Sequence, residues 1–81
     1  MTPRPSEVDL LFDAGMHLIP VEIKATQTPG PDDCTALRRF TALAGSKATA
    51  GVVFHMGATD ATMLEVRLAP WQQIDTVVSG W

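Results

Sequence analysis

The sequence predicts an α/β domain built on a mixed β-sheet, in which a β-hairpin precedes a β-α-β unit. Two observations favour this fold. Apolar residues alternate with polar ones on both sides of "AGM" at residues 14–16, and a stretch of helical periodicity lies between later apolar runs. The chain has 81 residues, which suffices for one small domain with a marginal core. We expect an extended N-terminus over residues 1–6 and a single domain over residues 7–81.

The first expected element is a hairpin over residues 7–26. Gly15 and Met16 suit its tip, because glycine at the first central position of a two-residue loop favours a type II′ turn. This turn fixes a register that pairs Ala14 with His17, Leu11 with Pro20, Asp9 with Glu22 and Glu7 with Lys24. A loop at Ala14 and Gly15 would shift the partners by two positions but would leave both faces unchanged.

Alternation gives this hairpin one apolar face and one face that carries its charges. The apolar face contains Val8, Leu10, Phe12, Ile19, Val21 and Ile23. The other face contains Glu7, Asp9, Leu11, Asp13, Leu18, Pro20, Glu22 and Lys24. We expect the apolar face to receive the helix that follows.

A loop, "TQTPGPDD", leads from the hairpin into a helix expected from about residue 32 to residue 44. A proline and two aspartates suit the helix start, and Gly45 suits its end. The apolar stripe of this helix contains Cys34, Leu37, Phe40, Leu43 and Ala44. The strands on either side of the helix should be parallel, joined by a right-handed crossover.

Two further strands are expected after the helix, "AGVVFHM" at residues 50–56 and "TMLEVRLA" at residues 62–69. Pro70 then opens a short turn or helix, which would place Trp71, Ile74 and Val77 or Val78 on one side. His55 lies within the third strand and is interpreted as a packed or edge residue and not as a ligand. His17 beside the turn should be exposed.

The composition limits the classes of function. A net charge of -3 and a pI near 5.0 argue against strong non-specific binding to nucleic acid, which usually rests on a basic surface. The single cysteine excludes an intramolecular disulfide and fits a reducing compartment. No apolar run approaches the ~20 residues of a membrane span. We therefore expect a cytoplasmic protein with no membrane association.

The charged hairpin face could carry chemistry. Asp9 and Glu22 should lie roughly 5 Å apart on neighbouring strands, where two carboxylates repel unless a cation separates them. Lys24 should lie about 7 Å along the same face. Metal ligands, a positioned water and a cation together form a minimal site for metal-assisted phosphodiester hydrolysis. Glu7, opposite Lys24, could be a further ligand through water or a salt-bridge partner.

The pattern "EVDLLFDAG…LIPVEIKAT" resembles the D…(D/E)-x-K motif of the PD-(D/E)XK nuclease superfamily, which has the restriction-endonuclease-like fold. With "GVVFHMG" and "LAPW", residues 7–74 resemble the C-terminal domain of a group of prokaryotic AAA-type ATPases. The resemblance implies that Asp9, Glu22 and the Ile23 carbonyl bind Mg²⁺ or Mn²⁺. It implies that Lys24 is the catalytic lysine.

The sequence also departs from that family. A restriction-endonuclease-like core normally begins with a helix and a further strand, and the chain starts directly at "MTPRPSEVD". No ATP-binding loop of the form G-x-x-x-x-G-K-[ST] is present. We expect a core without its N-terminal helix, whose open sheet edge would favour a homodimer.

Two functions stay open at this point. One is a Mg²⁺-dependent, nuclease-like domain acting on DNA, in which Arg38 and Arg39 contact phosphates and Glu7, Thr26 and Gln27 contact substrate. The other is a non-catalytic interaction or regulatory domain that binds an ATPase or another protein. The bland interpretation of the charged face is a solvated surface with a cross-strand ion pair, and that of the two arginines is an exposed helix surface.

Overall fold

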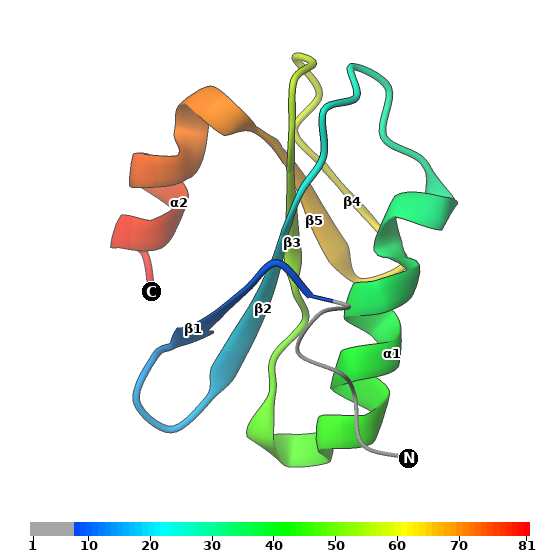
Figure 1. Cartoon of the computed structure of the whole chain (residues 1–81). Coiled ribbons are helices and arrows are strands. Elements are labelled where there is room, and N and C mark those ends of the chain that lie inside the picture. Colours follow the sequence, from blue (N-terminus) through cyan, green and yellow to red (C-terminus); the bar gives the residue numbers. More distant parts are fainter. Residues whose placement is uncertain (1–7) are drawn as a thin grey trace.

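The computed structural model describes residues 8–81, and it contains one five-stranded mixed sheet with a helix on each face (Figure 1). The strand order is β1-β2-β3-β5-β4. The elements are β1 (Leu10–Asp13), β2 (Leu18–Ile23), α1 (Thr35–Ala44), β3 (Val52–His55), β4 (Ala61–Met63), β5 (Val66–Pro70) and α2 (Ile74–Ser79). Short 3₁₀ turns at Pro31–Cys34 and Trp71–Gln73 lead into α1 and α2, and a third 3₁₀ turn at Gly45–Lys47 follows α1. The expected α/β class and mixed sheet are confirmed.

The hairpin has the predicted register. β1 pairs antiparallel with β2, and Leu11 lies opposite Pro20. Gly15 has a φ of +92°, whereas the φ of Met16 is not positive, which is the combination that a type II′ turn requires. The Ala14 N–H donates to the His17 carbonyl at 3.0 Å and closes the turn. From Leu10 onward the two faces of the hairpin are therefore those that the alternation predicts. Val8, expected on the apolar face, packs instead with Leu37 on the other side of the sheet, because the strand begins only at Leu10.

The β-α-β unit is also confirmed. β2 and β3 are parallel, and α1 crosses between them. The helix start is stabilised by Asp33, whose carboxylate accepts the Gly30 N–H at 2.8 Å. Gly45, with a φ of +61°, ends α1 at the expected position, because glycine adopts this left-handed conformation at low cost.

The single strand expected over residues 62–69 is a wrong prediction, because this segment folds into a hairpin. β4 and β5 pair antiparallel, and Leu64 and Glu65 form the turn with φ values of 51° and 69°. Two successive positive φ values are typical of a type I′ turn, which normally contains asparagine or glycine. Leucine and glutamate give no such signal, so the apolar run appeared continuous.

The expected docking of the helix on the apolar hairpin face is also wrong. Leu37 and Phe40 of α1 pack in one core cluster with Val53 and Leu68, which share a sheet face with Glu22. The opposite cluster contains Val21, Val52, Phe54, Ala69 and Val77, so α2 covers the hairpin's apolar face instead. A right-handed crossover decides which face α1 covers, and it does so whichever hairpin face is more apolar.

Because both faces are covered, β2 is buried from Ile19 through Glu22. The short helix α2 follows Pro70 as expected and contributes Val77 to the core. Within residues 8–81, neither helix is long and apolar enough to cross a membrane.

Candidate functional site

The charged residues of the motif meet where β2 ends. The alternation places Glu22 and Lys24 on one face, and the Lys24 Nζ lies 3.3 Å from the Glu22 Oε2. The Glu22 side chain is 5% exposed and that of Lys24 is 40% exposed. Glu22 is therefore not on a solvated surface, since α1 covers its face of the sheet. The lysine reaches solvent while the carboxylate is enclosed.

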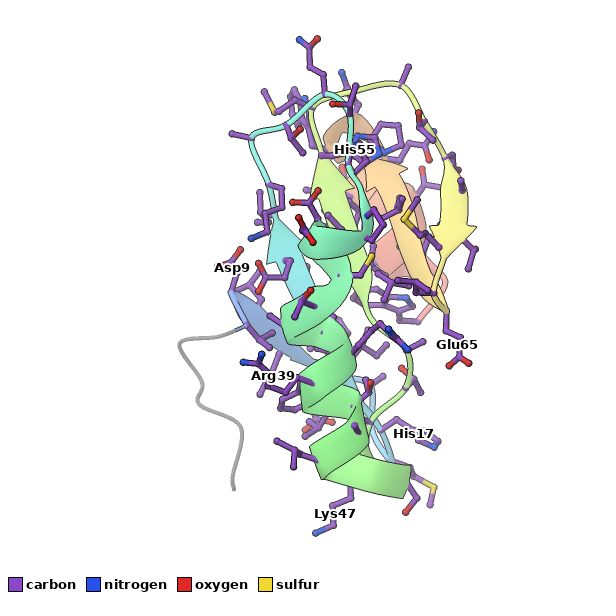
Figure 2. The ribbon with its side chains drawn as sticks, turned by 90° about the vertical axis from the view of Figure 1, so that its right-hand side faces the viewer. Asp9, His17, Arg39, Lys47, His55 and Glu65 are labelled. Carbon is purple, nitrogen blue, oxygen red and sulfur yellow. The ribbon has the colours of Figure 1, made fainter. Side chains whose placement is uncertain are left out.

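Asp9 is fixed at this end of the hairpin by a backbone hydrogen bond. Its Oδ2 accepts the Ile23 N–H at 2.8 Å. If the β1–β2 ladder continued, Val8 would lie opposite Ile23 and its carbonyl would accept the Ile23 N–H. Because β1 begins only at Leu10, the Asp9 carboxylate takes the place of this backbone acceptor. The Ile23 carbonyl points to the same side as its N–H, because both groups of a strand residue face one neighbour. Figure 2 shows Asp9 at this end and His17 at the far end of the hairpin.

The environment of Glu22 opposes its ionisation. Burial raises the pKa of this carboxyl above its ordinary value, and the charge and hydrogen bond of Asp9 raise it further. The Lys24 ammonium lowers the pKa of Glu22 by its charge and its hydrogen bond, but the net shift is upward. A buried carboxyl beside a second carboxylate is thus incompletely compensated by one lysine.

The donor set fits a hard divalent cation. Among the described residues, no three His, Cys, Asp or Glu side chains form a metal-binding group. Mg²⁺ binds with one or two carboxylates and keeps several waters, so Asp9, Glu22 and the Ile23 carbonyl would suffice. A cation would also remove the electrostatic conflict that raises the pKa of Glu22.

Comparison with known proteins gives a family. Residues 2–74 match the family described as Domain of unknown function (DUF4143). The chain belongs to the DUF4143 family. This family is commonly found in ATPase-associated proteins, in agreement with the ATPase part of the expected resemblance, and the match does not assign it to a nuclease family. No curated protein and no solved structure matches the chain.

The residues expected to contact substrate lie in different parts of this DUF4143 domain. Thr26 and Gln27 follow Lys24 in a loop that packs against the β3–β4 connection, where the Met56 N–H donates to the Thr26 carbonyl at 2.8 Å. The Thr26 hydroxyl accepts the Thr28 N–H at 3.3 Å, so it has an intra-loop role. Gln27 is exposed. Glu7 lies outside the described residues.

Arg38 and Arg39 are both exposed on α1, in agreement with the interpretation of an exposed helix surface. They line a cavity of about 560 Å³ together with Gly51, Glu65 and other residues near the β4–β5 turn. Asp9, Glu22 and Lys24 do not line this cavity. The arginines therefore line a different part of the surface from the charged motif, and Arg39 projects from the middle of α1 (Figure 2).

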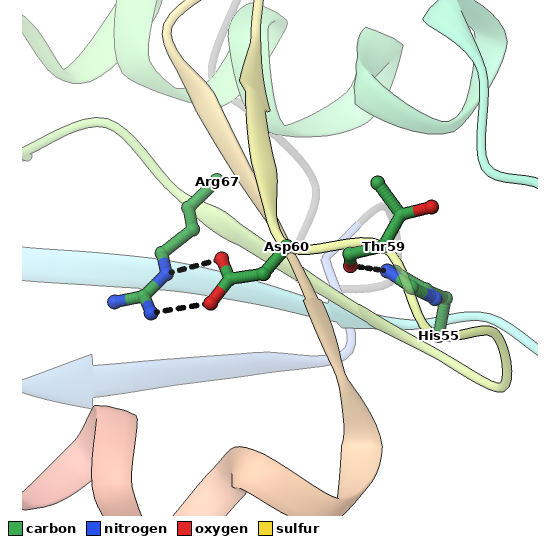
Figure 3. A network of polar contacts seen from close by, with 4 residues as sticks. All are labelled: His55, Thr59, Asp60 and Arg67. Carbon is green, nitrogen blue, oxygen red and sulfur yellow. Dashed lines mark hydrogen bonds and ion pairs between the residues drawn. The ribbon is translucent and has the colours of Figure 1, made fainter.

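A second polar cluster, which the sequence did not reveal, fixes the β3–β4 connection (Figure 3). His55 is fully buried, as expected of a packed residue. Its Nδ1 accepts the Gly57 N–H at 3.0 Å, and its Nε2 lies 2.8 Å from the Thr59 carbonyl. These partners define the neutral tautomer protonated at Nε2. Arg67 pairs with Asp60 at 3.3 Å, a contact that can be anticipated only once the β4–β5 hairpin is recognised. The His55 contacts hold the β3–β4 connection, and the Asp60–Arg67 pair joins the end of this connection to β5.

Proposed function

We propose that this DUF4143 domain is a nuclease-like module that hydrolyses phosphodiester bonds of DNA with Mg²⁺ or Mn²⁺. The observation that carries the proposal is the enclosed Glu22 carboxyl, held against Asp9 and beside the Lys24 ammonium. Folds avoid unpaired or like-charged carboxylates in buried positions unless a cation or a reaction requires them. The D…E-x-K pattern of Asp9, Glu22 and Lys24, whose side chains act on one another at the end of β2, is the feature on which the restriction-endonuclease-like resemblance rests.

The residues of the charged motif would have separate roles in metal binding and in the reaction. Asp9 and Glu22 would hold the metal, with the Ile23 carbonyl as a third donor. The bond from the Ile23 N–H orients Asp9 through one oxygen and leaves its other oxygen for this role. When bound, Mg²⁺ supplies Lewis-acid polarisation of a phosphate oxygen and stabilises the two carboxylates. Lys24, whose side chain is partly exposed, would orient the attacking water or neutralise the charge that develops on the phosphate.

The proposed DNA substrate would have to bind to a protein that carries a net negative charge. The net charge of -3 opposes approach of the DNA backbone, and the metal supplies positive charge at one point only. Arg38 and Arg39 on α1 are the basic residues proposed to contact phosphates, and they line a cavity separate from the charged motif. An associated ATPase or another protein would then supply the remaining affinity for DNA.

Paramagnetic Mn²⁺ tests the metal site independently of activity. We expect Mn²⁺ to broaden the amide signals of Asp9, Glu22 and Ile23 selectively, and Asp9→Asn to remove the effect. Asp60→Asn is the matched control, because Asp60 is an exposed carboxylate in an ion pair at the same distance. Broadening that is equal at Asp60, or absent at Ile23, would refute the site.

Cleavage of supercoiled plasmid DNA with Mg²⁺ then tests the chemistry. Wild type should nick the plasmid and Lys24→Ala should lose about two or more orders of magnitude in rate, as expected for loss of a group acting on the transition state. Equal rates for the two proteins would show that the cleavage comes from a contaminant. Mn²⁺ binding without cleavage would leave a metal site that lacks the proposed reaction.

The second candidate is a non-catalytic interaction or regulatory domain. A specific observation favours it: the edge strand β1 exposes large apolar side chains, and the family is commonly found in ATPase-associated proteins. The partner would be an ATPase, another protein or a second copy of this chain. Absence of selective Mn²⁺ broadening, together with binding at β1, would favour this function over the nuclease.

A further inference from the structure

One edge of the sheet is unusually apolar. Among the described residues, five of the nine exposed large hydrophobic side chains lie in the first hairpin: Leu10, Leu11, Phe12, Met16 and Ile23. β1 is an edge strand, and the figure shows it at the margin of the sheet (Figure 1). The other edge, β4, has only three residues with the sequence "ATM". Soluble proteins normally protect an edge with charges, proline or a short strand, so the exposure of β1 calls for a partner.

The backbone of β1 can accept another strand. The Ala14 N–H donates to the His17 carbonyl, so Ala14 and His17 form a hydrogen-bonded pair. Such pairs recur at every second residue of an antiparallel ladder, so Leu10 and Phe12 also direct their N–H and C=O groups toward β2. The N–H and C=O of Leu11 consequently point away from the sheet, as do those of Asp13. These outward groups are what an added antiparallel strand pairs with.

An apolar groove lies beside the same edge. Leu10, Phe12, Ile23, Ile74 and Trp81 are among the side chains that line this groove of about 160 Å³ on the α2 side of the sheet. The rings of Phe12 and Trp81 meet edge to face, with centroids 4.8 Å apart. Alternate side chains of a strand added at β1 would enter the groove, since successive residues point to opposite faces.

The charge of β1 identifies the occupant. Asp13 is exposed at the end of β1 and lies on the same face as Leu11, whereas the Asp9 carboxylate precedes β1 and turns toward β2, where it accepts the Ile23 N–H. We propose that β1 binds an extended apolar peptide segment that places a basic residue opposite Asp13. Opposite-charge pairs across strands are stabilising, whereas like charges directly opposite are destabilising. A second copy in the fully overlapped antiparallel register would bring Asp13 of each copy to the Asp9 end of the other, so like charges would approach twice, which disfavours this edge as a homodimer contact.

This inference is independent of the proposed nuclease function, because it rests on the strand edge and Asp13 and not on Asp9, Glu22 or Lys24. The probe is an acetylated peptide, Ser-Lys-Val-Ile-Val-Lys-Ser, titrated into the 81-residue chain and followed by NMR. We expect saturable shifts along β1 and protection of the Leu11 amide from hydrogen exchange. Asp13→Asn keeps an oxygen for the Gly15 N–H and should weaken binding about two- to five-fold.

Matched controls separate strand addition from non-specific contact. A peptide N-methylated at its central isoleucine loses the backbone bond to Leu11 and should not bind. A peptide with glutamate in place of both lysines should bind more weakly than the basic one. Leu11→Lys, at an exposed position, should abolish binding without affecting the fold.

Three results would overturn the proposal. Equal binding of the N-methylated peptide would exclude strand pairing. Equal binding of the acidic peptide would exclude the charge recognition. Sedimentation that shows a dimer dissolved by Leu11→Lys would assign the edge to a second copy of the chain.

Discussion

Replacing Lys24 with methionine should expose the electrostatic conflict at Glu22. Methionine retains most of the aliphatic stem, so the change removes the ammonium with little loss of packing. Glu22 would then remain buried beside Asp9 without its neutralising partner. Its pKa should rise further, because the ammonium is what lowers it in the wild-type protein.

The size of the effect follows from the exposure of the two side chains. An exposed ion pair contributes about 0–1 kcal/mol, and breaking a fully buried pair costs about 3–5 kcal/mol. Here the carboxylate is 5% exposed and the lysine 40%, at a separation of 3.3 Å. Discounting for the solvent around the lysine, we expect Lys24→Met to lower the free energy of unfolding by about 1–2 kcal/mol at pH 7.

Urea denaturation of a double-mutant cycle measures this effect. In a Glu22→Gln background the same lysine substitution should cost almost nothing, because no carboxylate is left unpaired. Arg67→Met is the matched control, since its pair with Asp60 has the same 3.3 Å separation but is 43–44% exposed, and it should cost less than about 0.5 kcal/mol. An equal cost of Lys24→Met in both backgrounds would refute the coupling.

Further predictions concern pH and backbone space. Since the folded-state pKa of Glu22 is raised, wild-type stability should fall as pH rises from 4.5 through the folded pKa, and Glu22→Gln should lack this fall in urea denaturation. Asp9→Asn should lower the pKa of Glu22, read from its carboxyl carbon shift by NMR, because a like charge is removed; an unchanged pKa would show that Asp9 does not act on it. A Cβ at position 57 would overlap the Gln27 carbonyl, so Gly57→Ala should cost about 1–3 kcal/mol of unfolding free energy, whereas Gly30→Ala, with open space around it, should be nearly neutral.

The sequence was most informative where local geometry decides the structure. A glycine in the tip of the hairpin set the register that pairs Leu11 with Pro20, and a long helical crossover made β2 and β3 parallel. The β4–β5 turn could not be anticipated, because Leu64 and Glu65 adopt a conformation that their side chains disfavour. In that turn the surrounding strand pairing overrides local preference.

The candidate site was predictable in one respect only. Period-2 alternation placed Glu22 and Lys24 on one face, but it gave no indication that this face would be covered. Burial of Glu22 depends on α1, whose position is fixed by the handedness of the crossover and by packing of Leu37 and Phe40. The bond from Ile23 to Asp9 depends on where β1 begins, and strand ends are the least predictable feature of a sequence.

Two ion pairs among the described residues, Glu22–Lys24 and Asp60–Arg67, show why Glu22 points to function. Asp60 and Arg67 are joined at 3.3 Å on the surface, where both partners stay hydrated and the pair is inexpensive. Glu22 and Lys24 have the same separation, but the carboxylate is enclosed and a second carboxylate acts on it. A hydrophobic residue at position 22 would satisfy the same core with less cost, because replacing a buried pair by apolar residues is often neutral or stabilising. The fold therefore does not require this carboxylate, and a ligand that offsets its burial is the physical reason we propose for its presence.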